Sequence, residues 1–255
     1  MGILVKAEMR KMLFRKSIII TWIALLLISR MLIHPATSAE VWADVFSKSY
    51  GFAPMIGLIT FMIISATYTL EYNSNMNELI NTTQNGKKNV VMAKWIGAGI
   101  STTIVNVSIV LTICIDGLIK AGFKGLDLPL KELWYFGNSG SNITVLQMII
   151  ILIITVTIGS FFFSQLGLYL SAISKSASIP FIFGGLLMGL PYVLPVILFG
   201  VVSVKYLGIT PLWGMMSGQL IRYRVPMELI MVQIVIVIAG FVFLSKLTYK
   251  AFIKE

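Results

Sequence analysis

Residues 71–94, EYNSNMNELINTTQNGKKNVVMAK, form a polar island in an otherwise apolar sequence. Apolar runs long enough to cross a bilayer lie on both sides, so this segment is expected to sit in water between two membrane spans. The residues at the spacing i, i+3, i+4 and i+7 within it are Met76, Leu79, Ile80 and Thr83. This spacing places them on one face of a short amphipathic helix, which predicts a surface that a soluble partner binds.

The composition indicates an integral membrane protein. Of the 255 residues, 57% are hydrophobic and only 12% are charged, whereas a soluble domain has about 25% charged residues. The apolar runs are continuous and do not alternate with polar residues, so they predict helices and not the strands of a β-barrel. We expect an all-α fold with six transmembrane helices, at about 17–33, 51–70, 95–115, 145–173, 179–204 and 227–247.

The net charge of +10 is assigned to membrane orientation and anionic lipid headgroups and not to nucleic acid. With the six spans drawn as above, twelve of the 20 Lys and Arg residues fall on one side and eight on the other. Both termini are therefore predicted to lie in the cytoplasm, with the chain in the cell membrane of a bacterium. Residues 1–16 read as a basic amphipathic helix on the inner membrane surface.

The connections predict one transmembrane domain over residues 1–255. An outer loop is expected at 34–50 and a larger one at 120–144, which either covers the outer mouth or is a simple connector. Residues 205–226 are apolar but too broken to cross, which favours an outer re-entrant hairpin. Pro191 and Pro195 are expected to kink the fifth span.

Small residues indicate close contacts between helices. One face of the fourth span and one GxxxG pattern in the fifth contain them, and the residues are Ser160, Ser164, Gly167, Ser171, Gly185 and Gly189. Packing within one subunit and a dimer interface both remain open.

The residues that an enzyme would need are missing. His34 is the only histidine, so no HExxH zinc site can form, and no GxSxG sequence is present. Gly86-Lys87-Lys88 lacks the upstream glycine and the hydroxyl residue of a phosphate-binding loop. The single cysteine, Cys114, reads as inert core. We therefore expect no catalytic, metal or cofactor site in this chain; if transport uses ATP and Mg²⁺, another chain must bind them.

Taken together, these features resemble the transmembrane permease of type-2 ATP-binding-cassette (ABC) exporters. In that family a basic interfacial helix leads into six spans with both termini inside. Glu71 matches the family's acidic residue at the membrane exit, 75–83 the coupling helix, 82–87 the following turn and Lys94 the lysine that opens the next span. The chain departs from the family at the turn, where Gln84 or Asn85 and Lys87 stand in place of the usual Pro and Arg.

The resemblance implies that separate ATPase subunits dock on the coupling helix and rock the spans between inward- and outward-facing states. It also implies a dimer with a second permease copy or a paralogue, and Glu71 and Lys94 as structural anchors. A helix that merely lies on lipid headgroups is the alternative. The implied docking residues are Met76, Glu78, Leu79, Ile80, Thr83, Lys87, Lys88 and, in the second cytoplasmic turn, Lys175.

The cargo is expected to be amphipathic or hydrophobic, because the spans contain almost no charge. Compact permeases of this size resemble exporters of antimicrobial or cytolytic peptides, including lantibiotic immunity and phenol-soluble modulin exporters. Phe161-Phe162-Phe163 and Met215-Met216 could contact such cargo or face lipid. The rival hypotheses are a gradient-driven carrier, for which Asn106 and Asp116 are the buried polar candidates, and a membrane scaffold without transport.

Overall fold

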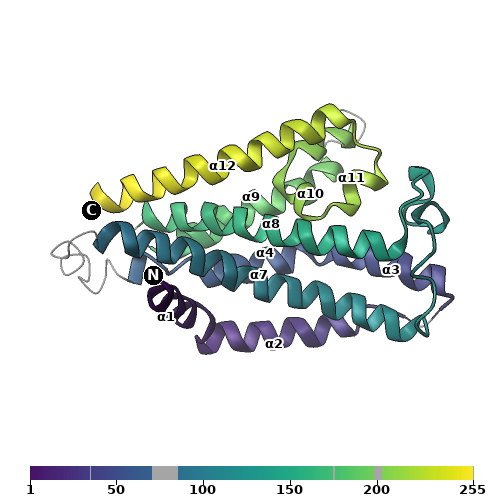
Figure 1. Cartoon of the computed structure of the whole chain (residues 1–255), viewed down its shortest axis with the longest axis horizontal. Helices are drawn as coiled ribbons and strands as arrows, with labels where there is room; N and C mark the ends of the chain where they lie inside the picture. The colour runs from purple at the N-terminus through teal and green to yellow at the C-terminus, as the bar shows by residue number, and fades with distance from the viewer. Residues whose placement is uncertain (35, 71–85, 175, 198–202, 255) are drawn as a thin grey trace.

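The computed structural model describes residues 1–34, 36–70, 86–174, 176–197 and 203–254. Over these residues the chain is helical, and Figure 1 shows long helices lying side by side in a bundle. The α-helices are α1 (Gly2–Leu13), α2 (Lys16–Arg30), α3 (Ser38–Gly51), α4 (Ala53–Ile64), α7 (Gly86–Lys120), α8 (Val145–Ala172), α9 (Ser178–Ile197), α10 (Pro211–Met215), α11 (Gly218–Arg222) and α12 (Met227–Lys254). Three short 3₁₀ helices are η1 (Leu130–Glu132), η2 (Gly137–Ser139) and η3 (Val204–Ile209).

Several of these helices make the chain a multi-pass membrane protein by length and composition. Three of them, over Lys88–Lys120, Val145–Ala172 and Met227–Phe252, are long and apolar enough to cross a bilayer. The bent pairs α1–α2 and α3–α4 raise the number to five if each pair is one span. The prediction of an all-helical membrane protein is confirmed, but the described residues give three to five candidate spans where six were expected. The apolar part of α9 that is described, Ser178–Leu194, is shorter than the others.

The segment 34–50, which we expected to be an outer loop, is mostly helix α3. Thr37 begins it, because Glu40 accepts hydrogen bonds from the Thr37 amide (3.1 Å) and hydroxyl (2.8 Å). Trp42 and Phe46 are buried in the bundle. The loop prediction was wrong: the charged residues of this segment lie on the less buried side of an amphipathic helix, whose other side packs into the bundle.

Helix α3 continues into α4 after a bend of 42°, so the second apolar segment begins well before residue 51. At the N-terminus, α1 meets α2 at 70°. A helix of 12 residues is too short to cross a bilayer, which takes about 20. Helix α1 is therefore not a straight extension of α2, and its place on the inner membrane surface stays a prediction.

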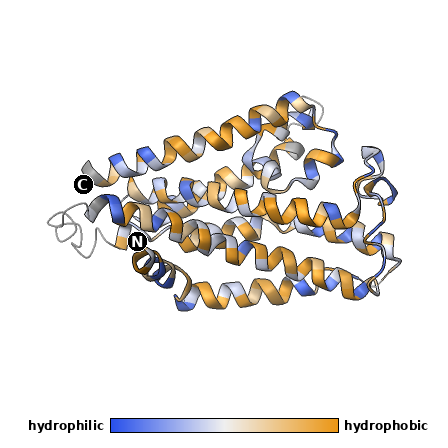
Figure 2. Ribbon diagram, viewed as in Figure 1, coloured by the Kyte–Doolittle hydropathy of each residue, from blue (hydrophilic) through white to orange (hydrophobic). Residues whose placement is uncertain are grey.

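Both termini and the beginning of α7 lie at one end of the bundle, and the connection between α7 and α8 lies at the other (Figure 1). Figure 2 shows hydrophobic residues along the long helices and hydrophilic residues mainly toward the two ends. This distribution is the one that a bilayer requires of a bundle that crosses it.

The long connection between α7 and α8 is folded onto the bundle. Its backbone pairs with the start of α8, since the Leu130 amide donates to the Ile143 carbonyl (2.9 Å) and the Val145 amide to the Leu128 carbonyl (3.0 Å). Phe136 is fully buried and packs edge-on against Phe46 of α3 (centroids 5.4 Å apart). The segment is thus tied to α3 and α8 through a small core of its own.

The segment predicted as a re-entrant hairpin, 205–226, contains η3, α10 and α11. Figure 1 shows α10 and α11 on the same side of the bundle as α12, and α10 contacts both α8 and α12. Trp213, Met215 and Met216 in this segment are buried. The segment is therefore packed protein and not an exposed connector.

Candidate functional site

The predicted docking surface falls largely outside the described residues. The docking residues that lie outside them are Met76, Glu78, Leu79, Ile80, Thr83 and Lys175, and the predicted anchor Glu71 lies outside them too. The backbone of Lys87 belongs to the first turn of α7, and Lys88 beside it is exposed. The described part of the site is therefore the end of the bundle from which residues 71–85 leave and to which they return.

Lys94, the predicted anchor, is buried at this end, with its side chain only 1% exposed. Its ammonium donates to Glu8 Oε2 of α1 at 2.8 Å and lies 3.5 Å from the Thr67 carbonyl oxygen. The same ammonium lies 5.4 Å from the centroid of the Tyr68 ring, within cation–π range. A single side chain of α7 thus contacts α1 and the chain that leads out of α4.

Glu8 is the partner that the sequence did not reveal. Its other oxygen accepts from Lys11 at 2.8 Å, but Lys11 is 60% exposed while the Glu8 side chain is 9% exposed. Burial raises the pKa of the Glu8 carboxyl, and the Lys94 and Lys11 ammonium groups lower it by more, so the pKa lies below the ordinary value. The only available signal was that Glu8 is the sole acidic residue among the basic residues of 1–16.

Backbone packing holds α1 close to α7 beside this ion pair. A Cβ at Gly97, one turn beyond Lys94, would meet Glu8 Cβ at 3.4 Å and the Val5 carbonyl oxygen at 3.5 Å. Arg15, between α1 and α2, donates to the carbonyl of Ile63 in α4. Helix α1 and the residue that links it to α2 are therefore attached to α7 and α4, the helices on either side of the predicted docking loop.

A second polar cluster lies inside the bundle, where α4, α7 and α8 meet. Asn106 Nδ2 donates to Thr60 Oγ1 and to Ser160 Oγ, each at 3.0 Å, and all three residues are 0% exposed. Ser160 in turn donates to the Val156 carbonyl (2.7 Å). Because the side-chain amide of Asn106 is already bonded to α4 and to α8, we interpret the cluster as a hydrogen-bonded link between three helices.

Asp116, the other polar candidate, lies near the opposite end of α7. Its carboxylate accepts from Lys120 at 2.7 Å, and Lys120 also donates to the Ile33 carbonyl at 2.5 Å. The pair therefore ties the end of α7 to the residues after α2.

The small-residue face of α8 packs against α4 and the residues after it. Ser171 Oγ donates to the Ser65 carbonyl (3.0 Å) and accepts from the Tyr68 amide (3.1 Å). A Cβ at Gly167 would meet Ile64 Cγ2 at 3.1 Å. With Ser160 bonded to Asn106, three of the four residues on this face contact other helices; the fourth, Ser164, is buried and donates within α8.

The GxxxG pattern in α9 behaves differently. A Cβ at Gly185 or Gly189 would meet nothing within 4 Å among the described residues, so these glycines make no close contact in the monomer. Gly184 does, because a Cβ there would overlap the Phe61 ring of α4. The sequence pattern therefore missed the glycine at which α9 approaches its neighbour within this chain.

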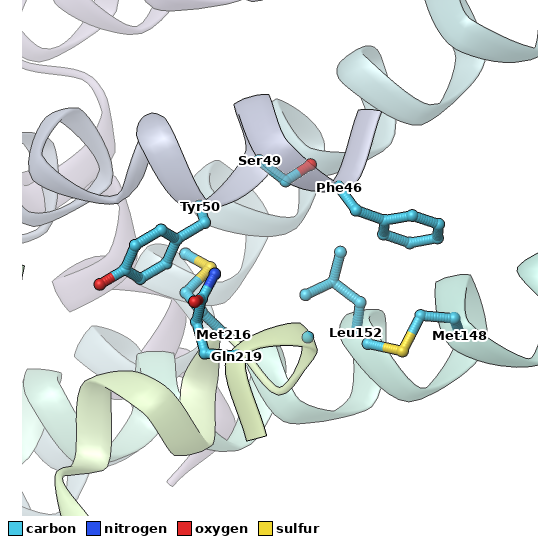
Figure 3. Close-up of a pocket in the computed structure, with 8 residues that line it drawn as sticks. Phe46, Ser49, Tyr50, Met148, Leu152, Met216 and Gln219 are labelled. Carbon is cyan, nitrogen blue, oxygen red and sulfur yellow. The ribbon is translucent and has the colours of Figure 1, made fainter. Parts of the chain in front are cut away.

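Hollows lie beside the segment 205–226, and two of them reach α8. Figure 3 shows the first, where Tyr50 of α3 lies close to Gln219 and Met216, with Phe46 and Leu152 beside them. Its volume of about 10 Å³ admits roughly one water molecule and no substrate. The second has about 490 Å³ between α8, α10 and α12, and its lining is mainly apolar, including Ile158, Phe162, Met215, Ile234 and Phe241.

Comparison with known proteins adds no relative: no family model, no curated protein and no solved structure matches the chain.

Proposed function

We propose that this chain is the transmembrane subunit of an ATP-driven ABC exporter that moves amphipathic or hydrophobic cargo, such as peptides or antimicrobials, out of the cell. Partner ATPase subunits bind ATP and Mg²⁺ and dock on the coupling loop, residues 71–94, through its residues from Met76 to Lys88, and on the second turn at Lys175. The chain works as a dimer with a second copy or a paralogue. The proposed topology has six spans, of which α9 is the fifth, and both termini lie in the cytoplasm.

One observation carries the proposal, namely the buried contact of Lys94 with Glu8. Lys94 is the last residue of the predicted coupling loop, 71–94, while Thr67 and Tyr68, which it also contacts, lie three or four residues before the loop begins. A movement of the loop would therefore act on α4, α7 and α1 together through groups that are already in contact. A passive loop between two spans needs no such buried ion pair, which costs desolvation energy.

The apolar hollow beside α12 supports the class of cargo. Phe162 and Met215, two of the residues considered for cargo contact, line it from the buried core, and Phe163 and Met216 are buried without lining it. Only 6% of the most apolar stretch of α12 is buried within the chain, so lipid or a second copy is expected to cover this helix. An apolar surface of this kind fits acyl chains or the apolar face of a peptide better than ions or sugars.

A gradient-driven carrier has less support. It would need a buried group that can exchange its partner for an ion or a proton. Asn106 is bonded to Thr60 and Ser160, and Asp116 is paired with Lys120. Both candidates therefore have structural partners.

Co-purification tests the proposed docking. The tagged full chain is purified from its native membranes, and ATP-binding partners are identified by photolabelling with an azido-ATP and by ATP hydrolysis. The variant with Leu79→Asp and Ile80→Asp is expected to lose both the label and the hydrolysis, because two charges would lie in an apolar contact. Ile3→Asp is the matched control, since Ile3 is 88% exposed at the same end of the bundle.

Retention of a stimulated ATPase by the double variant would refute the docking face. A second measurement addresses the energy source: the purified chain alone in liposomes is expected to move no peptide. Flux driven by an ion gradient without nucleotide would overturn the proposed function.

A further inference from the structure

A hollow of about 440 Å³ opens at the end of the bundle opposite to the termini, between the α7–α8 connection and the segment around α11. Its volume is within the range of ligand sites, roughly 300–1,000 Å³. The side chains that carry its chemistry are Tyr135, Asn138, Lys205, Arg222, Tyr223 and Arg224.

Aromatic rings hold Arg222 in place. Its guanidinium carbon lies 4.1 Å from the centroid of the Tyr135 ring and 5.2 Å from that of Tyr223. Tyr135 is 4% exposed and accepts a hydrogen bond from Gln219, while Tyr223 stacks on Trp213 at 5.2 Å. The guanidinium is thus positioned before any ligand arrives, which lowers the entropy cost of binding.

Arg224 is held by its backbone and by the neighbouring connection. Its φ of 47° lies in the left-handed region, which is uncommon for a residue other than glycine. Its Nε donates to the Ser139 carbonyl at 3.0 Å. A Cβ at Gly140 would come within 3.1 Å of Arg224 Nη2, so the connection passes close to this side chain. Such backbone strain concentrates at sites where a side chain must point in one direction.

The hollow has three cationic side chains and, among the described residues, no carboxylate in its lining. The ion pairs in the described part of the chain are those of Glu8 and Asp116 with lysines, and none involves Lys205, Arg222 or Arg224. Three cations without an acidic partner create a positive potential that favours an anionic ligand.

We propose that this hollow binds a phosphate group, carried either by a membrane lipid or by a soluble compound. A single arginine fork satisfies the two oxygens of a carboxylate, whereas two arginines and a lysine match the additional oxygens and charge of a phosphate. Trp134 and Tyr206 are 59% and 57% exposed at this end, as aromatic residues are at the membrane interface, which favours the lipid headgroup. This proposal depends on the placement of this end of the bundle at the membrane interface, and it does not depend on the proposed docking of an ATPase.

The test is binding of dioctanoyl phosphatidylglycerol to the full chain in detergent, measured by native mass spectrometry. The variant with Arg222→Gln and Arg224→Gln is expected to bind at least about tenfold more weakly, because it loses hydrogen bonds between charged groups. Lys205→Gln, whose side chain is exposed, is expected to bind several-fold more weakly and covers the case in which the double variant fails to fold. The matched control removes two exposed cations from the same end of the bundle, with Lys124→Gln and Lys131→Gln, and is expected to bind as the wild type does.

Competition distinguishes the source of the phosphate. If glycerol 1-phosphate displaces the lipid at similar concentration, the ligand is a soluble phosphate compound; if it does not, the ligand is a lipid headgroup. Glycerate, which has a carboxylate in place of the phosphate, is expected not to displace the bound lipid. Displacement of the lipid by glycerate would overturn the proposal. Unchanged lipid binding by a folded arginine or Lys205 variant would also overturn it, and so would equal weakening in the control.

Discussion

The buried pair of Glu8 and Lys94 makes the sharpest prediction about stability. Glu8→Gln keeps the size of the side chain but removes its charge, which leaves the Lys94 ammonium with the Thr67 carbonyl at 3.5 Å and the Tyr68 ring at 5.4 Å among its contacts. Removing one partner of a buried ion pair costs about 3–5 kcal/mol. At about 2–4 °C per kcal/mol, the midpoint of thermal unfolding should fall by roughly 6–20 °C.

The assay is thermal unfolding of the detergent-purified chain, followed by tryptophan fluorescence, together with hydrogen exchange of the α1 amides. Trp95 is adjacent to Lys94 in α7 and reports on this end of the bundle. The amides of α1 should exchange faster in Glu8→Gln than in the wild type, because the ion pair holds α1 against α7. A second variant that combines Glu8→Gln with Lys94→Met should recover part of the loss, since no buried charge is then left without its partner.

Lys11→Gln is the control. Lys11 lies at the same 2.8 Å from Glu8 but is 60% exposed, so its loss should cost at most about 1 kcal/mol. A loss of stability in Lys11→Gln equal to that in Glu8→Gln would refute the reasoning from burial. Strict additivity of Glu8→Gln and Lys94→Met would refute the proposed pairing.

Three further predictions concern packing, the interior cluster and pH. Gly184→Ala should destabilise the monomer by about 1–3 kcal/mol in thermal unfolding because the added methyl group overlaps a ring, whereas Gly185→Ala should not; equal effects would contradict the α4–α9 contact. Asn106→Ala should cost about 1–3 kcal/mol through its lost hydrogen bonds, and Thr157→Val, which loses a bond within α8 only, should cost less; the reverse order would argue against a cluster that joins helices. The depressed pKa of Glu8 predicts stability that is present above the ordinary value of 4.5 and lost as the pH falls through the lower folded value, and Glu8→Gln should remove this acid-dependent part of the unfolding curve.

The missed helix α3 shows the limit of reading local composition. Residues 34–50 were expected to form an outer loop, whereas the pairing of Thr37 with Glu40 is the local signal that begins a helix there. The helix is stabilised by Trp42 and Phe46, which bury against residues that come later in the chain. Local composition cannot report such burial, because the neighbouring surface is supplied by other helices.

By itself, the sequence determined that the chain is helical, that it belongs in a membrane and approximately where its three longest helices lie. An uninterrupted apolar run has few alternatives in a bilayer, since every backbone polar group must be bonded within the segment. Only the tertiary structure decided that Glu8 meets Lys94, 86 residues away, and that Arg222 lies over Tyr135. These contacts depend on the rotation of each helix about its axis and on the angles at which helices cross. The residues next to a side chain in the sequence do not determine which surface of another helix it will contact.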